Sequence, residues 1–234
     1  VVLKVAGDLE ELSVHFTTEG KAQKQVLDVQ KNAIVTLPIT FEAVDAGYAA
    51  LKLRSKGSGT ITLAAISLMP EDNIEGFRPD VIALLKELDS PPGGNFVSGY
   101  DWKDGIGNPD ARPTRYERAW NGLEYNDVGI HEFMQLCKIL DAEANIAVNT
   151  GLGDAALAAN EVEYFNGAAT TPMGKRRAAN GHPEPYDVQL WAVGNEMFGD
   201  WQLGHMPIEE YVKKHNKVAE AMWAVDPDID LIAV

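Results

Sequence analysis

A chain of 234 residues is long enough for one large domain or for two smaller ones with buried cores. Its 20 basic and 35 acidic residues give a formal net charge of −15, which argues against nucleic acids and anionic membranes as partners. The single cysteine, Cys137, excludes an intrachain disulfide and a cysteine-based zinc cluster.

The start of the sequence leaves the cellular compartment open. No apolar run is as long as a membrane span, and no signal peptide begins at Val1. Because the chain opens in the middle of a predicted strand and without a methionine, we expect its natural N-terminus to be missing. A cytoplasmic and a secreted protein are both compatible with these features.

Residues 1–68 are predicted to form strands only. Apolar and polar residues alternate there, and turns such as Glu19-Gly20 and Gly57-Ser58-Gly59 separate the runs. This spacing predicts an antiparallel β-sandwich, a form common among carbohydrate-binding modules; no aromatic cluster marks a sugar platform, so structural support is the favoured role. The expected strands are Val1–Val5, Leu12–Phe16, Gln25–Val29, Ile34–Thr40, Tyr48–Arg54 and Thr60–Ser67.

The pattern changes at residue 69, where helices begin to alternate with strands. Pro79 is expected to start a helix, because proline favours the first helical turn. Its apolar face is expected to consist of Val81, Leu84, Leu85 and Leu88. A long polar loop follows up to residue 120, and loops of that length are usually functional or disordered. Its aromatic residues, which argue against disorder, are Phe96, Tyr100, Trp102, Tyr116 and Trp120.

The remaining sequence predicts three strands separated by helices. Asn126 or Asp127 is expected to cap the first helix, and Thr170–Tyr186 is expected to be a long connection. Such alternation indicates a parallel sheet with helical crossovers, either open or part of an eight-stranded barrel. The expected strands are Asn145–Asn149, Val188–Val193 and Asp230–Val234, and the expected helices begin near Ile130, Asp154 and Pro207.

The strand Val188–Val193 ends in Gly194-Asn195-Glu196, which Trp201, Gln202 and His205 soon follow. In a barrel of alternating strands and helices, the carboxyl end of a strand is where catalytic groups lie. A carboxylic acid can protonate a leaving oxygen, a neighbouring amide can hold a hydroxyl, and aromatic rings can stack on a sugar. This stretch therefore predicts a sugar-processing site with Glu196 as its acid.

Two other motifs have simpler interpretations. Gly151-x-Gly153-x-x-Ala156 lies between a strand and a helix, as a dinucleotide fingerprint does, but no second strand with an acidic end follows, so a tight turn is favoured. His131-Glu132 lacks the second histidine of the helical zinc motif, which favours a partly exposed helical pair. Cys137 is expected in the core.

Several sequence blocks, taken together, resemble family 51 glycoside hydrolases, the α-L-arabinofuranosidases. The resemblance covers residues 67–234, and the match of the N-terminal sandwich to a module inserted early in the barrel of some members is looser. The blocks are Ser67-Leu-Met-Pro70, Pro92-Gly-Gly-Asn-Phe-Val-Ser-Gly-Tyr-Asp-Trp102, Asp104-Gly-Ile-Gly107, Arg112-Pro113, Trp120, Glu124 to Phe133, Ala147-Val-Asn149, Val162-Glu-Tyr164, Asn180-Gly-His182 and Trp191 to His205.

The resemblance implies an α/β fold, a partial (β/α)8 TIM barrel of about strands two to five over residues 69–234, preceded by the antiparallel β-sandwich module of residues 1–68. It implies a retaining mechanism with Glu196 as general acid/base and Asn195 on the sugar 2-hydroxyl. Asn95 matches a substrate-pocket asparagine and Trp120 an aromatic residue near the leaving group. Glu196 should have a raised pKa, and this paired-carboxylate chemistry needs no metal and no organic cofactor.

The implied substrates are arabinofuranosyl-containing oligosaccharides or polysaccharides such as arabinan and arabinoxylan. The family nucleophile is a second glutamate on a later strand than this sequence reaches, and the first barrel strand is also absent. About four residues of the family pattern are missing between Ser90 and Pro92. The chain is therefore expected to be incomplete, and an endo-β-glucanase and a non-catalytic carbohydrate-binding chain stay open as alternatives. Linkage preference and assembly into a homo-oligomer also stay open.

Overall fold

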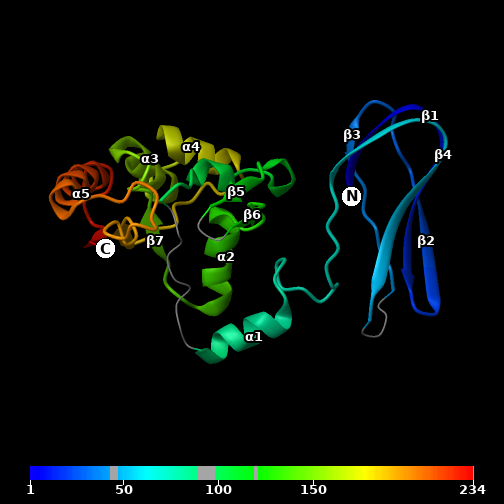
Figure 1. Ribbon diagram of the computed structural model, residues 1–234, viewed down its shortest axis with the longest axis horizontal. Coiled ribbons are helices and arrows are strands. Elements are labelled where there is room, and N and C mark those ends of the chain that lie inside the picture. The colour runs from blue at the N-terminus through cyan, green and yellow to red at the C-terminus, as the bar shows by residue number, and fades with distance from the viewer. Residues whose placement is uncertain (43–46, 89–97, 119–120, 234) are drawn as a thin grey trace. The chain divides into compact units, whose positions relative to one another are not determined.

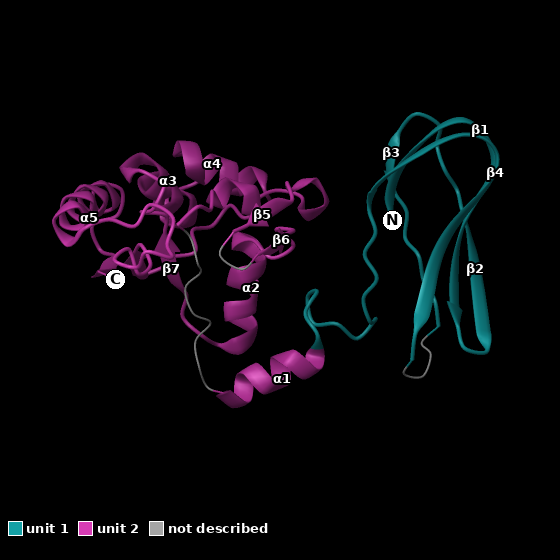
Figure 2. Ribbon diagram, in the orientation of Figure 1, with its two compact units in different colours: residues 1–78 teal, residues 79–234 magenta. Residues whose placement is uncertain are grey.

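The computed structural model describes residues 1–42, 47–88, 98–118 and 121–233, and the chain divides into two compact units, Val1–Arg78 and Pro79–Val234 (Figure 2). The first unit is built of strands, and the second combines helices with strands (Figure 1). Within the described ranges, no helix has both the length and the apolar composition that crossing a membrane requires.

The first unit is a four-stranded antiparallel sheet organised around β1. The strand β4 pairs with β1 along nearly its whole length, while β2 and β3 pair with its C-terminal and N-terminal parts. Buried side chains from both parts of β1, among them Leu3 and Val14, belong to one apolar cluster, and Leu37, Ile39 and Phe41 from the segment after β3 pack against it. The strands are β1 (Val2–Thr18), β2 (Lys21–Leu27), β3 (Ile34–Thr36) and β4 (Ala49–Ala65).

The turn predicted at Gly57-Ser58-Gly59 is wrong, because these residues lie inside β4 and pair with 7–9 of β1. The two strands predicted on each side of it are one strand, and the two predicted at the start of the chain are likewise one strand, β1. Gly57 has φ +94°, and a Cβ there would overlap the carbonyl oxygen of Asp8. The ladder shifts register next to this point, so the glycines mark a bulge rather than a chain reversal. The turn at Glu19-Gly20 is confirmed.

The second unit contains a parallel sheet in the order β7-β8-β9, which confirms the predicted parallel strands with helical crossovers. Trp191 of β8 is fully buried against the ring of Phe165 of α3, with their centroids 5.3 Å apart. The elements are α1 (Pro79–Leu88), η1 (Trp102–Gly105), η2 (Pro109–Ala111), β5 (Arg115–Glu117), β6 (Gly122–Glu124), α2 (Ile130–Leu140), β7 (Asn145–Val148), α3 (Ala155–Asn166), α4 (Pro172–Ala179), β8 (Leu190–Val193), α5 (Ile208–Trp223) and β9 (Asp230–Ala233).

The connection predicted over Thr170–Tyr186 contains a helix, α4, which apolar periodicity does not reveal. Thr171 caps it by accepting a hydrogen bond from the Gly174 N–H at 3.2 Å, and Pro172 opens it. The buried guanidinium of Arg177 donates to carbonyl oxygens of α3 and of residues 182–183. Hydrogen bonds from Arg177, together with packing of Met173 against the core, therefore hold this helix in place.

Two details of the predicted helices are corrected. The cap expected at Asn126 or Asp127 is wrong: α2 begins after Gly129, whose N–H donates to the Glu132 carboxylate at 2.8 Å. In α1 the buried residue is Ile82, whereas Leu84 and Leu88 of the predicted apolar face are exposed. Cys137 lies in the core, as predicted.

Candidate active site

The loop from Gly194 to His205 follows β8 and has an unusual backbone at its start. Gly194 has φ +98°, and a Cβ there would overlap the hydroxyl oxygen of Thr150, which follows β7. Glu196 has φ +49°, a left-handed conformation that costs a non-glycine residue free energy and tends to occur at functional sites. This bend turns the chain sharply at the strand end and leaves the Glu196 side chain exposed.

The exposed carboxylate of Glu196 has an aromatic neighbour. The Trp201 indole N–H donates to Glu196 Oε2 at 3.2 Å, although the Trp201 side chain is 62% exposed. Gly199 makes room for this arrangement, since a Cβ there would overlap the Trp201 ring. Phe198 meets Trp201 edge-on, with their ring centroids 5.9 Å apart. An acid and two open aromatic faces therefore share one surface.

Of the predicted site residues, the structure brings Asn195 and Glu196 together at the carboxyl end of β8, with Asn195 half-buried. Asn95 and Trp120 lie outside the described residues. The roles assigned to all four stay predictions.

The loop after β7 packs directly against the loop after β8. Asn149 donates from its amide to the Tyr100 carbonyl at 2.8 Å and accepts from the Gly153 N–H at 3.0 Å. Gly151 lies directly against the backbone of the loop after β8, since a Cβ there would overlap the Leu203 carbonyl oxygen. The Gly151-x-Gly153 motif thus serves close backbone packing in a tight turn before α3.

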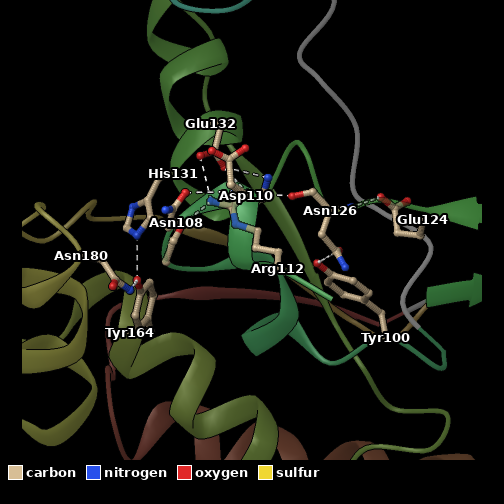
Figure 3. A network of polar contacts seen from close by, with 12 residues as sticks. Tyr100, Asn108, Asp110, Arg112, Glu124, Asn126, His131, Glu132, Tyr164 and Asn180 are labelled. Carbon is tan, nitrogen blue, oxygen red and sulfur yellow. Dashed lines mark hydrogen bonds and ion pairs between the residues drawn. The ribbon is translucent and has the colours of Figure 1, made fainter. Parts of the chain in front are cut away.

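A buried polar network lies at the start of α2 (Figure 3). The Arg112 side chain is 1% exposed and donates to both carboxylate oxygens of Glu132 at 2.9 Å, to the Asn126 carbonyl at 2.8 Å and to the Gly107 carbonyl at 2.9 Å. Arg112 and the Gly129 N–H lower the pKa of Glu132 against the opposing effect of burial. Asn126 accepts from the Tyr100 hydroxyl at 2.8 Å. Apart from the buried Arg112 Nε, which has no hydrogen-bond partner among the described residues, the hydrogen-bonding groups of Arg112 are satisfied within the protein.

His131 is held within the same region by two tyrosines. Its Nδ1 lies 2.6 Å from the Tyr186 hydroxyl and its Nε2 2.7 Å from the Tyr164 hydroxyl, and its ring stacks on His182 with centroids 4.0 Å apart. Burial, with a smaller contribution from His182, lowers the pKa of His131 to about 4. The predicted partly exposed His131-Glu132 pair is wrong for His131, which partners distant in sequence cover, whereas Glu132 is partly exposed. Both ring nitrogens are occupied, and the described part of the chain holds no cluster of three or more His, Cys, Asp or Glu side chains suited to a metal.

A cavity of about 620 Å³ adjoins the strand-end loops. Leu152 and Leu203, from the loops after β7 and β8, form part of its wall. Aromatic and charged groups also line the cavity: the Tyr116 ring, and Arg115, which binds Asp104 in a bidentate ion pair. Flat rings beside charged hydrogen-bonding groups are suited to a polar, ring-shaped ligand.

The sequence model described as the alpha-L-arabinofuranosidase 1 domain matches residues 87–234. The chain belongs to this family. The resemblance to α-L-arabinofuranosidases inferred from the sequence blocks is therefore confirmed. Arg112, the segment 180–182 and Ser98 all lie in those blocks, which were the one sequence signal for them; no local pattern indicated which partners they contact.

Curated relatives of this α-L-arabinofuranosidase domain include an intracellular exo-alpha-(1->5)-L-arabinofuranosidase of Acetivibrio thermocellus, 44% identical over 163 residues. A second, from Bacillus subtilis, is 43% identical over 168 residues. These matches cover 68% and 70% of this chain but 32% and 34% of the relatives. The chain spans about a third of the length of the curated relatives it matches.

Solved structures agree. An arabinose complex of the Thermotoga maritima α-L-arabinofuranosidase is 44% identical, with a TM-score of 0.65, over 68% of this chain and 34% of its own. A family 51 α-L-arabinofuranosidase from Bifidobacterium longum is also 44% identical, with a TM-score of 0.66, over 70% of this chain and 33% of its own. A third arabinofuranosidase is 20% identical but covers 99% of this chain and 43% of its own, with a TM-score of 0.74, and that likeness concerns the fold alone.

Proposed function

We propose that this chain is the acid/base-bearing part of a retaining α-L-arabinofuranosidase that releases terminal arabinofuranosyl groups from arabinan-type or arabinoxylan-type substrates. One observation carries the proposal: within a domain of this family, an exposed glutamate, Glu196, stands at the carboxyl end of a parallel strand beside Asn195 and Trp201. The relatives named as exo-acting arabinofuranosidases favour this activity over an endo-β-glucanase.

We extend the proposal to the architecture. The parallel order β7-β8-β9, with helices between the strands, supports three consecutive strands of a (β/α)8 barrel. The antiparallel first unit supports a β-sandwich module. The ladder of β4 ends at Ala65, which supports a sandwich over residues 1–68; the barrel portion is proposed over 69–234, and its compact part begins at Pro79.

In the proposed reaction, Glu196 donates its proton to the glycosidic oxygen as the bond to the anomeric carbon breaks. A second carboxylate attacks the anomeric carbon and forms the glycosyl-enzyme bond as the leaving group departs, so Glu196 supplies one of the two carboxyl groups that the mechanism requires. The ionised Glu196 then takes a proton from the water that releases the sugar. Because Trp201 donates to Oε2, Oε1 is the oxygen assigned to the transferred proton. Asn195 would hold the sugar 2-hydroxyl, and Asn95 and Trp120 would complete the pocket.

The test uses the full gene product in which this chain occurs and phenyl α-L-arabinofuranoside as substrate. Glu196→Gln should lower kcat/KM roughly 10²- to 10⁴-fold, the usual contribution of a general acid. Glu209→Gln removes an exposed carboxylate at the start of α5 and should leave activity unchanged.

Three results would overturn parts of the proposal. Full activity of Glu196→Gln would remove Glu196 from the reaction. Hydrolysis of glucan with no action on arabinofuranosides would make the substrate wrong. Binding of arabino-oligosaccharides without any turnover would favour the non-catalytic alternative.

A further inference from the structure

We propose that Ser98 and Gln202 form a positioning pair that fixes the Glu196-bearing loop against the loop after β7. Both side chains are buried, at 0% and 6% exposure, and the Ser98 hydroxyl donates to Gln202 Oε1 at 2.7 Å. This inference rests on the proposed function, because it concerns how Glu196 is held for proton transfer.

Ser98 connects two strand-end loops at once. Its backbone carbonyl accepts the N–H of Leu152, in the loop after β7, at 2.9 Å. Its hydroxyl reaches Gln202, in the loop after β8, and lies 4.0 Å from the buried sulfur of Met197, the residue that follows Glu196. The Ser98 side chain therefore anchors the loop after β8 at two points, at Met197 beside Glu196 and at Gln202.

Two successive turns join Glu196 to Gln202. The Gly199 N–H donates to the Glu196 carbonyl at 2.9 Å, and the Gln202 N–H donates to the Gly199 carbonyl at 3.0 Å. Trp201, which holds the Glu196 carboxylate, stands directly before Gln202. A shift of Gln202 therefore reaches both the backbone and the carboxylate of Glu196.

The packing leaves little room to absorb such a shift. A Cβ on Gly151 would lie 2.5 Å from the Ser98 carbonyl oxygen, and one on Gly204 would lie 2.6 Å from the Gly151 backbone. Glu196 itself keeps a left-handed backbone, which persists only where the surroundings enforce it. Loss of the Ser98–Gln202 bond leaves a buried polar group unpaired and removes part of that enforcement.

The consequence is specific to proton donation. A displacement of about 1 Å at a reacting group can cost about 100-fold in rate. A leaving group that needs a proton depends on the position of Glu196, whereas a 2,4-dinitrophenolate departs without one. We therefore expect the pair to matter for the first kind of substrate only.

The experiment measures kcat/KM of the full gene product on phenyl and 2,4-dinitrophenyl α-L-arabinofuranoside. Ser98→Ala and Gln202→Met should each lower the phenyl value roughly 10- to 100-fold and change the dinitrophenyl value less than about threefold. The double variant should match either single variant, because one interaction is lost in all three. Ser98→Thr keeps the hydroxyl and should recover most of the phenyl activity.

Thr171→Ala removes the cap of α4 and serves as a control for general destabilisation; it should not change the ratio of the two activities. Equal losses on both substrates, or additive effects in the double variant, would overturn the inference. Gln202→Met preserves length and bulk, so it tests the pair even if Ser98→Ala fails to fold. If Glu196→Gln shows no selective loss on the phenyl substrate, the proposed function fails instead, whatever the pair does.

Discussion

Two polar regions of the second unit differ in what their side chains face. Around Arg112, the Glu132 carboxylate and two backbone carbonyl oxygens accept from one guanidinium, and the Arg112 side chain is almost completely buried (Figure 3). After β8, Glu196 and Trp201 share one hydrogen bond and are otherwise open to solvent. Both regions lie in sequence blocks typical of the family.

The difference separates residues that build the domain from residues able to meet a substrate. A buried charge needs partners from the protein, so Arg112 and Glu132 are committed to each other. An exposed carboxylate at a strand end retains hydrogen-bonding capacity for a ligand. The following predictions test whether the first region controls stability and the second controls chemistry.

The largest effect on stability is expected from Arg112→Met. Loss of the guanidinium leaves the Glu132 carboxylate without its cation and two carbonyl groups without this donor, which should lower the free energy of unfolding by about 3–5 kcal/mol. Urea unfolding measures it. Arg115→Met is the matched control, because Arg115 also forms a bidentate pair, with Asp104, but lies on the surface. Arg115→Met should lower the free energy of unfolding much less than Arg112→Met does. Equal decreases would contradict the assignment of a buried network.

A pair of glycines tests the strand-end bend. Gly194 and Gly181 have similar φ angles, +98° and +93°, but only Gly194 faces a close neighbour, Thr150. Alanine in this conformation costs about 1–2 kcal/mol, which should be the whole effect at Gly181. At Gly194 the overlap should raise the loss to about 3 kcal/mol and displace Glu196, lowering activity as well. Thermal unfolding and kcat/KM of both variants measure the contrast; similar behaviour would show that the bend tolerates a side chain.

His131 should make stability fall in mild acid. A histidine whose pKa drops to about 4 on folding binds fewer protons than the unfolded chain between that value and about 6.5. The stability that the neutral His131 contributes is therefore complete above pH 6.5. As the pH falls towards 4, the free energy of unfolding drops by about 2 kcal/mol. His131→Gln should reduce this loss of stability. Urea unfolding at pH 7 and at pH 4.5, each about 0.5 units above one of the two pKa values, measures it. An unchanged pH dependence would contradict the burial of a neutral imidazole.

Glu161 of α3 should give the opposite pH dependence. Burial, helped by Asp101, raises its pKa to about 8, so the folded state binds more protons than the unfolded chain between roughly pH 4.5 and 8. Stability is then lost as the pH rises through this range. Glu161→Gln should raise the free energy of unfolding by about 2 kcal/mol near pH 8 and by little near pH 5. A destabilised variant at both pH values would contradict this expectation.

The smallest effect is expected at the cap of α3. Asp154 accepts the Leu157 N–H at 2.8 Å in an exposed position, so Asp154→Ala should cost about 1 kcal/mol. Asp154 follows the loop after β7 but takes no part in the Ser98–Gln202 contact. The ratio of phenyl to dinitrophenyl activity should therefore stay constant, and a selective loss on the phenyl substrate would extend the positioning role to this cap.

Local patterns determined much of the second unit. The apolar runs predicted β7 and β8, the proline at the start and the apolar repeat predicted α5, and the strand-end Gly194-Asn195-Glu196 predicted where an acid would stand. The sequence blocks also determined the family. These signals act over a few neighbouring residues, which is the range over which strand alternation, helix periodicity and capping operate.

The tertiary structure decided the contacts between residues that lie far apart in the sequence. The partners of His131 lie 33 and 55 residues away, and Ser98 and Gln202 are 104 residues apart. The glycines at 57 and 59 look like a turn until β1 pairs with them. Burial and pairing depend on which distant segments meet, so the same residue types become a bulge, a closed network or an anchor only once the chain has folded.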